Sequence, residues 1–160
     1  MPQQPGRELL YWDDVPLGVT TAFGSHRVTR EEIIDFARTY DPQPFHIDDE
    51  AARALGFDRL IAPGWHACGM MMRLLAENVL NMAAALGSPG VDECRWLKPI
   101  FAGDDLSCSY TCLSKRELKS RPGVGLCQMQ MEMVNQSGET VMTWKSAMLM
   151  RVRHPGAQSS

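Results

Sequence analysis

The sequence lacks any apolar stretch long enough to cross a bilayer, because the longest one is interrupted by Arg73, Glu77 and Asn78. The first seven residues also lack the apolar core of a secretion signal. Positive charge is not in excess either, since 16 lysines and arginines stand against 19 aspartates and glutamates. Such a balance provides no general basic field for nucleic acid or acidic membranes. These absences predict a cytoplasmic protein that binds neither nucleic acid nor membranes.

The cysteines have neither the spacing of a redox pair nor that of a zinc site. They are five, an odd number: Cys68, Cys94, Cys108, Cys112 and Cys127. Scattered cysteines of this kind are typical of reduced, small, buried side chains. A cysteine nucleophile is disfavoured, because Cys68 lies within an apolar stretch and no cysteine lies next to a histidine in a loop. The sequence therefore predicts no metal site and no thiol chemistry.

The length of 160 residues is enough to bury one core without disulfides. Nothing in the composition marks a second domain. We therefore expect a single domain over residues 1–160, with its core at about 11–153 and short flexible termini.

The most informative segment is 41–46, which reads DPQPFH and places a carboxylate and an imidazole five positions apart. Its two prolines fix φ and favour extended geometry at the residues before them, so the segment is a stiff loop rather than a helix. On such a bend Asp41 and His46 can converge on one water molecule, the imidazole exchanging a proton while the carboxylate orients the water. An isolated Asp and His at this spacing more often lie in a solvated loop, so the flanking sequence has to decide.

The flanking sequence predicts helices on both sides of this loop. Before it, Thr29 and Glu32 have the spacing of a capping box, followed by an amphipathic pattern through Tyr40. After it, Asp48 is a predicted N-cap of a second short helix that stops at Gly56. A third helix, apolar on most sides and therefore buried, is predicted from Gly64 to about Met82.

The second half of the sequence predicts strands. Alternating apolar and polar residues at 127–133 and 142–150, separated by an Asn-Gln-Ser-Gly turn, indicate a hairpin. Further strands are predicted at 19–28, 91–98 and 106–113. Together these elements predict an α+β domain in which an antiparallel β-sheet packs around the long helix. The methionines of the hairpin have the spacing of a core face and are predicted to pack there: Met129, Met131, Met133, Met142, Met148 and Met150.

Three segments resemble the signature regions of the MaoC-like dehydratases, also called R-specific enoyl-CoA hydratases. They are FARTYDPQPFHIDDEAA, IAPGWHACGMMMRLL and RWLKPIFAGDDL, and the likeness extends from about residue 11 to 153. The resemblance implies the hotdog fold and a homodimer or higher homo-oligomer whose sheets join edge to edge. It also implies that Asp41 and His46, in the positions of the D-x-N-P-x-H motif, act on the water that adds to an acyl thioester. Gln43 stands where the family has Asn, and Tyr40 stands where Gly commonly precedes the Asp.

Hydration of an unsaturated thioester builds negative charge on the carbonyl oxygen, which needs a donor placed in advance. The amide of Gly64, at the positive end of the predicted central helix, is such a donor, and the resemblance implies the same residue. The alternative is that Pro63 and Gly64 form only a turn before a buried helix. Gln43, Pro63 and Trp65 are the further residues expected to contact substrate.

The sequence thus predicts a hydro-lyase that adds water reversibly to trans-2-enoyl-CoA, giving by resemblance (3R)-3-hydroxyacyl-CoA. No cofactor is implied other than the coenzyme A of the substrate. One alternative is a hotdog acyl-CoA thioesterase, for which the only acid on the central helix, Glu77, lies some three turns from Gly64. Another is a non-catalytic acyl-CoA binding module.

Two further groups of side chains have no assigned role at this point. Lys115, Arg116, Lys119 and Arg121 form a basic cluster that is either a solvated turn or an attractor for the phosphates of coenzyme A. His66, two residues after Gly64, is more often structural than catalytic in such a position, and His26 and His154 carry no motif.

Overall fold

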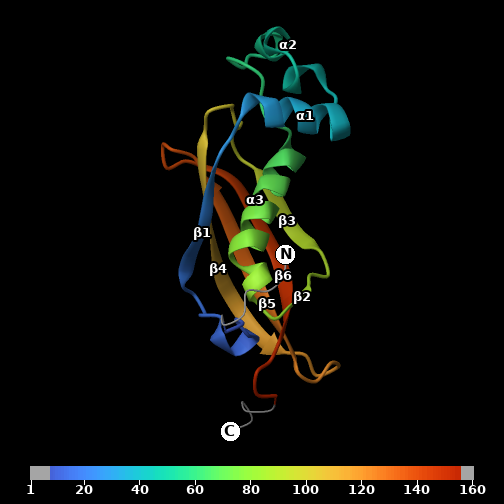
Figure 1. The fold of residues 1–160 in the computed structure, drawn as a ribbon, viewed down its shortest axis with the longest axis vertical. Helices are drawn as coiled ribbons and strands as arrows, with labels where there is room; N and C mark the ends of the chain where they lie inside the picture. The colour runs from blue at the N-terminus through green and yellow to red at the C-terminus, as the bar shows by residue number, and fades with distance from the viewer. Residues whose placement is uncertain (1–7, 156–160) are drawn as a thin grey trace.

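The computed structural model describes residues 8–155, in which six strands form one antiparallel sheet and a long helix lies along one face of it (Figure 1). The strands are β1 (Thr20–Arg27), β2 (Ala85–Gly87), β3 (Val91–Trp96), β4 (Asp105–Glu117), β5 (Val124–Val134) and β6 (Thr140–Arg151). The α-helices are α1 (Arg30–Tyr40), α2 (Asp49–Ala54) and α3 (Gly64–Asn78), and the 3-10 helices are η1 (Trp12–Asp14), η2 (Pro44–His46) and η3 (Leu80–Met82). The expectation of flexible termini concerns 1–7 and 156–160, which lie outside the described residues.

The order of the strands across the sheet is β1-β4-β5-β6-β2, and β3 also pairs with β6. All these pairings are antiparallel. The long hairpin of β5 and β6 is therefore central, with β1 at one edge and the short strands β2 and β3 following one another along the other edge. Within the described chain, the outer edge of β3 has no partner strand.

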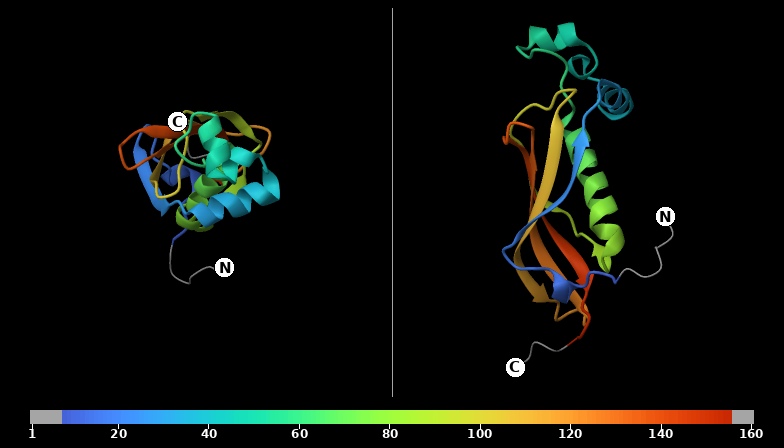
Figure 2. Two further views of the ribbon diagram at one scale, coloured as in Figure 1. Left: turned by 90° about the horizontal axis from the view of Figure 1, so that it is seen from above. Right: turned by 60° about the vertical axis from the view of Figure 1, so that its left-hand side comes forward.

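The sheet curves around α3, which is buried on the side that faces it (Figure 2). Met71 of α3 is fully buried, and all six methionines predicted to face the core from the hairpin are buried as well. Unbranched, polarizable methionines fill the irregular space between a round helix and a twisted sheet. The predicted α+β fold with a sheet wrapped around a central helix is thereby confirmed.

One predicted boundary differs from the structure, and one strand was not predicted. The central helix ends at Asn78 rather than near Met82, because Val79 leaves the helical region, with φ −133° and ψ −62°, and residues 80–82 form η3. The side-chain amide of Asn78 donates to the carbonyl of Leu74 and occupies one of the last acceptors of the helix. The strand β2 was not predicted, because its three residues are too few to show an alternation.

The two short helices α1 and α2 lie together beyond one end of the sheet (Figure 2). The predicted caps are confirmed: the hydroxyl of Thr29 accepts from the amide of Glu32, and the carboxylate of Asp48 accepts from the amide of Ala51. Gly56, at φ +90°, provides the left-handed residue that ends α2. The loop from Asp41 to His46 is thus held between two capped helices.

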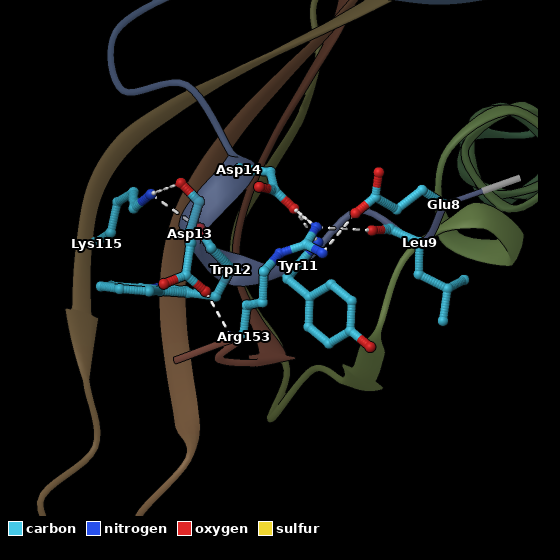
Figure 3. A network of polar contacts seen from close by, with 8 residues as sticks. All are labelled: Glu8, Leu9, Tyr11, Trp12, Asp13, Asp14, Lys115 and Arg153. Carbon is cyan, nitrogen blue, oxygen red and sulfur yellow. Dashed lines mark hydrogen bonds and ion pairs between the residues drawn. The ribbon is translucent and has the colours of Figure 1, made fainter. Parts of the chain in front are cut away.

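At the other end of the sheet, the segment before β1 is fastened to β4 and to the C-terminal residues (Figure 3). The ammonium of Lys115 donates to the carbonyls of Trp12, Asp13 and Val15 and lies 4.6 Å from the Trp12 ring centroid. The guanidinium of Arg153 pairs with the carboxylates of Glu8 and Asp14. These contacts seat the buried Trp12 against the start of β5.

Trp12 leaves no room for a side chain at Gly125 of β5, since a Cβ there would overlap its indole ring. Gly125→Ala is therefore expected to lower the free energy of unfolding by about 2 to 3 kcal/mol, as overpacking does in a filled core. Gly69→Ala is the matched control, because a Cβ at Gly69 meets nothing within 4 Å, and alanine inside a helix stabilises by about 0.5 to 1 kcal/mol. Urea denaturation measures both, and equal stability of the two variants would show that Trp12 is not seated there.

Candidate active site

The loop between α1 and α2 fixes the directions of two titratable side chains. Asp41 is the C-cap of α1, and its amide donates to the carbonyl of Ala37 over 2.8 Å. Three residues later the chain enters η2, where the amide of His46 donates to the carbonyl of the N-cap residue Gln43 over 3.0 Å. The proline at the start of η2 has no amide hydrogen to satisfy and a φ already suited to a helical turn. Asp41 and His46 therefore belong to two adjoining, locally hydrogen-bonded turns.

The carboxylate of Asp41 and the imidazole of His46 face one another, with 3.2 Å between Oδ2 and Nε2. Nδ1 of His46 lies 2.7 Å from the carbonyl oxygen of Ile61. A carbonyl can only accept, so Nδ1 carries the hydrogen and Nε2 is the nitrogen left to exchange a proton. The His46 side chain is 6% exposed and that of Asp41 is 22% exposed, so solvent reaches the pair from the Asp41 side.

Gln43 orients this pair. Its side-chain amide donates to Oδ1 of Asp41 over 2.7 Å, which leaves Oδ2 directed toward His46. The longer amide at a position where the family has Asn thus reaches back to the carboxylate two residues earlier. Tyr40, the other departure from the motif, is 74% exposed, and its ring packs against Phe36 rather than over Asp41. Both departures leave the Asp41–His46 contact in place.

Gly64 begins α3 and has an unpaired amide. The first amide of the helix that donates to backbone is that of His66, to the carbonyl of Pro63. Among the described residues, neither Gly64 nor Trp65 has an acceptor for its backbone N–H. The preceding segment is held in place, since the amide of Ala62 donates to the carbonyl of Ile100 and the carbonyl of Ile61 accepts from His46. Only two residues, Ala62 and Pro63, therefore separate the acceptor of the His46 hydrogen bond from a helix N-terminus with free donors.

The other residues expected to contact substrate differ in accessibility. Trp65 is 65% exposed, whereas Pro63 is fully buried. Pro63 is the N-cap of α3, and its burial leaves no exposed surface for a ligand within one chain. A residue that the sequence analysis missed, Trp96, lies against Gly64 and meets Trp65 edge-on, with 5.4 Å between ring centroids. Its only signal in the sequence was its place in the third family segment.

A second cluster of titratable groups lies on the flank of α3 that faces β1 and α1. The carboxylate of Glu32 is 2.7 Å from Nε2 of His26 and 3.5 Å from Nε2 of His66. The imidazole of His66 stacks on Phe36, with 4.9 Å between ring centroids. These four side chains line a cavity of about 370 Å³, which also contains Arg73 and Glu77 of α3. His66 thus joins α1 to the first turn of α3.

Burial lowers the pKa of His66 below its ordinary value of 6.5, and the charge of Glu32 opposes part of that shift. As the pH falls below about 6.5 the unfolded chain takes up this proton first, so stability that is complete at neutral pH declines toward the folded pKa. We expect His66→Phe, which keeps the stacking surface, to lose less melting temperature than the native protein between about pH 7.5 and about pH 5.5. His154→Gln, in the exposed C-terminal segment, should behave as the native protein. If the melting temperature of His66→Phe depended on pH as strongly as that of the native protein, His66 would not be the group whose lowered pKa causes the loss of stability.

Two other groups considered from the sequence take no part in this site. The ammonium of Lys115 donates to three backbone carbonyls. Lys115 lies near the end of β4, whereas Asp105, at the start of β4, pairs with Arg27 next to α1 at the opposite end of the sheet. The predicted basic cluster therefore lies far from Asp41 within one chain. Burial raises the pKa of the thiols of Cys68, Cys108 and Cys127 to about 12, which agrees with their being unreactive side chains.

Neither of the two cavities that can be described, the one at His66 and another of about 440 Å³ beside Arg153, includes Asp41, His46 or Gly64. On the β3 side of Gly64 the chain instead exposes large apolar side chains, namely Trp65, Met72, Trp96 and Leu97. No helix among residues 8–155 has the length and apolarity required to span a bilayer.

Known proteins share this fold and this sequence pattern. A MaoC-like dehydratase from Rhodospirillum rubrum, whose crystal structure is known, is 36% identical with a TM-score of 0.84, covering 91% of this chain and 99% of that one. A UPF0336 protein of Saccharopolyspora erythraea is 31% identical over 132 residues, which are 79% of this chain and 83% of the relative. Mesaconyl-CoA hydratase of Cereibacter sphaeroides is 29% identical over 154 residues, 92% of this chain and 43% of that protein. Residues 14–130 match the MaoC like domain, and the chain therefore belongs to the MaoC-like dehydratase family.

Proposed function

We propose that the protein is a hydro-lyase that adds water reversibly to trans-2-enoyl-CoA, giving (3R)-3-hydroxyacyl-CoA. The observation that carries this proposal is the contact between Asp41 and His46, 3.2 Å apart, with one side chain partly open to solvent. The family contains dehydratases and hydratases, among them the mesaconyl-CoA hydratase that this chain resembles. Addition of water transfers a hydroxyl and a proton only, so we propose no cofactor beyond the coenzyme A of the substrate.

In the proposed hydration, a water molecule in contact with both Asp41 and His46 attacks C3 of the enoyl group. Nε2 of His46 takes one proton from the water as the new C–O bond forms, while Asp41, oriented by Gln43, holds the water. The electron pair of the double bond moves toward the thioester, and the carbonyl oxygen becomes negative. The free amide of Gly64 stabilises that charge, and a proton delivered by the same pair to C2 completes the product. Dehydration is the reverse of these steps.

The test is to incubate the purified protein with trans-2-enoyl-CoA esters of increasing chain length and to follow loss of the conjugated absorbance. Chromatography on a chiral phase then identifies the configuration of the product. We expect a (3R)-hydroxyacyl thioester and no free coenzyme A. Release of free coenzyme A would identify a thioesterase instead, and binding without turnover of any ester would identify a binding module.

The local geometry favours the hydratase over these two alternatives. A thioesterase needs a carboxylate near the thioester, but Glu77 is paired with Arg73 over 2.9 Å on the polar flank of α3. A binding module has no need of a carboxylate held by Gln43 against an imidazole that is itself fixed by Ile61. Four of the five free thiols are buried, and we place the reaction in the reducing cytoplasm.

We further propose that two copies associate through the outer edge of β3. That edge is unpaired within the described chain. Val91 begins β3 and Leu97 follows its last residue, and these apolar side chains, 48% and 51% exposed, flank the charged residues Asp92, Glu93 and Arg95 of the strand. An unpaired edge is a template for pairing with a second strand, and a second copy in this position would cover the exposed side of Gly64. The partner would then complete the acyl-binding pocket that one chain leaves open.

Val91→Lys is expected to convert the dimer to a monomer, because it replaces an exposed apolar side chain at the proposed contact with a further charge, and charges at a free edge oppose strand pairing. Light scattering coupled to gel filtration should give about twice 17.9 kDa for the native protein and one chain mass for the variant. Leu17→Lys is the control, since Leu17 is 59% exposed and precedes β1 at the opposite edge. A native protein that elutes as a monomer at all concentrations would rule out the dimer.

A further inference from the structure

We propose that Trp96 sets the upper size of the acyl group that the protein accepts, with Trp65 as the second wall, so that short unbranched enoyl thioesters are preferred. This inference rests on the proposed function and specifies its substrate class.

Trp96 lies directly beside the amide proposed to bind the thioester oxygen. A Cβ built on Gly64 would lie 2.6 Å from Cε2 and 2.7 Å from Cδ2 of Trp96. The indole therefore covers the Cα of Gly64, and the unpaired N–H of Gly64 is one covalent bond from that Cα. Any oxygen that accepts from Gly64 has the Trp96 ring as a near neighbour, and so has the acyl carbon attached to it.

Two contacts hold Trp96 in this position. The backbone of Trp96 is fixed in β3 by pairing with Met142 of β6. The ring of Trp65 meets that of Trp96 at an interplanar angle of 77°, an edge-on arrangement that aromatic pairs favour. The indole is itself 47% exposed, so these two contacts, rather than enclosure, keep it beside Gly64 as a wall.

The acyl chain has one apolar route along α3 from Gly64. Trp65 and Met72 are seven residues apart, so they lie on the same face of the helix, and they are 65% and 40% exposed. The other flank carries the polar cluster of His66, Arg73 and Glu77. An apolar chain bound at Gly64 therefore leaves along the Trp65–Met72 face, and Trp96 stands at its beginning. The volume of the indole there excludes long or branched acyl chains.

The experiment compares kcat/KM for crotonyl-CoA and for trans-2-octenoyl-CoA in the native protein, Trp96→Ala and Trp96→Phe. Truncation of the indole is expected to raise the ratio of octenoyl to crotonyl turnover by at least about tenfold in Trp96→Ala, and by less in Trp96→Phe. Leu113→Ala, which removes an exposed apolar side chain in β4 away from Gly64, should leave the ratio at its native value. Thermal melting confirms that each variant is folded. If Trp96→Ala does not fold, the chain-length ratio of Trp96→Phe tests the proposal.

The outcomes separate the two proposals. Active variants with an unchanged chain-length ratio would overturn the role of Trp96 while leaving the hydratase assignment intact. A native protein with no hydration of either ester would overturn the proposed function, and the inference about Trp96 with it. A ratio that rises in Leu113→Ala as well would show that loss of stability, rather than the indole, controls the selectivity.

Discussion

Asp41→Asn and His46→Gln are each expected to lower kcat/KM for hydration of an enoyl-CoA ester by about a thousandfold, the range of a general acid or base placed on a reacting water. The reason lies in their shared geometry: their side chains are 3.2 Å apart, and in the proposed mechanism Asp41 holds the water that His46 deprotonates. The double variant should be no more than slightly worse than either single one, because residues that act as a unit lose their effect together. Initial rates at saturating and at low ester concentration separate kcat from KM.

Matched controls exist for both substitutions. Asp35 lies on the exposed side of α1 and His154 in the exposed C-terminal segment, so Asp35→Asn and His154→Gln change the same functional groups away from the site. Both should retain native activity. If Asp41→Asn and His46→Gln were folded and kept activity within about tenfold of the native protein, a role in general acid or base catalysis would be excluded.

Gly64→Ala is expected to lower kcat about a hundredfold although the backbone N–H remains, because displacement of a positioning group by about 1 Å is enough for such a loss. The added methyl would meet Trp96 at 2.6 Å, so either the indole or the first turn of α3 has to shift. The same collision should lower the free energy of unfolding by about 2 kcal/mol. Gly69→Ala on the same helix again serves as the control, since it meets nothing within 4 Å.

The double variant Gly64→Ala/Trp96→Ala tests whether this collision is the cause. Once the indole is removed, the methyl at position 64 occupies vacated space, so the cost of Gly64→Ala should largely disappear in that background. A coupling free energy of about 1 to 2 kcal/mol between the two sites is expected from urea denaturation. Additive effects of the two substitutions would mean that Trp96 does not lie on Gly64.

The local features of the site could be predicted from the sequence because short-range physical chemistry sets them. Two prolines stiffen the loop before His46, and the caps at Thr29 and Asp48 begin the helices on either side of it. The alternation of methionines specified the β5–β6 hairpin and its buried face. Resemblance to three family segments then pointed to the Asp41–His46 pair, whose members are close in sequence and meet across one turn.

Features that depend on distant residues could not be predicted in this way. His26 and His66 converge on Glu32 from three elements, and no spacing in the chain predicts that meeting. Lys115 reads as part of a basic cluster in the sequence, yet its ammonium is enclosed by carbonyls about a hundred residues earlier in the chain.

The sequence by itself determined the α+β class, the capped helices, the stiff loop with its acid and imidazole, and the family, since each depends on neighbouring residues or on a recognisable order of segments. Only the tertiary structure decided that Trp96 lies on Gly64, that Ile61 fixes the His46 tautomer, and that β3 has a free outer edge. The physical reason is that side-chain contacts between elements depend on how a helix and a curved sheet pack, and packing is a property of the whole chain rather than of any segment.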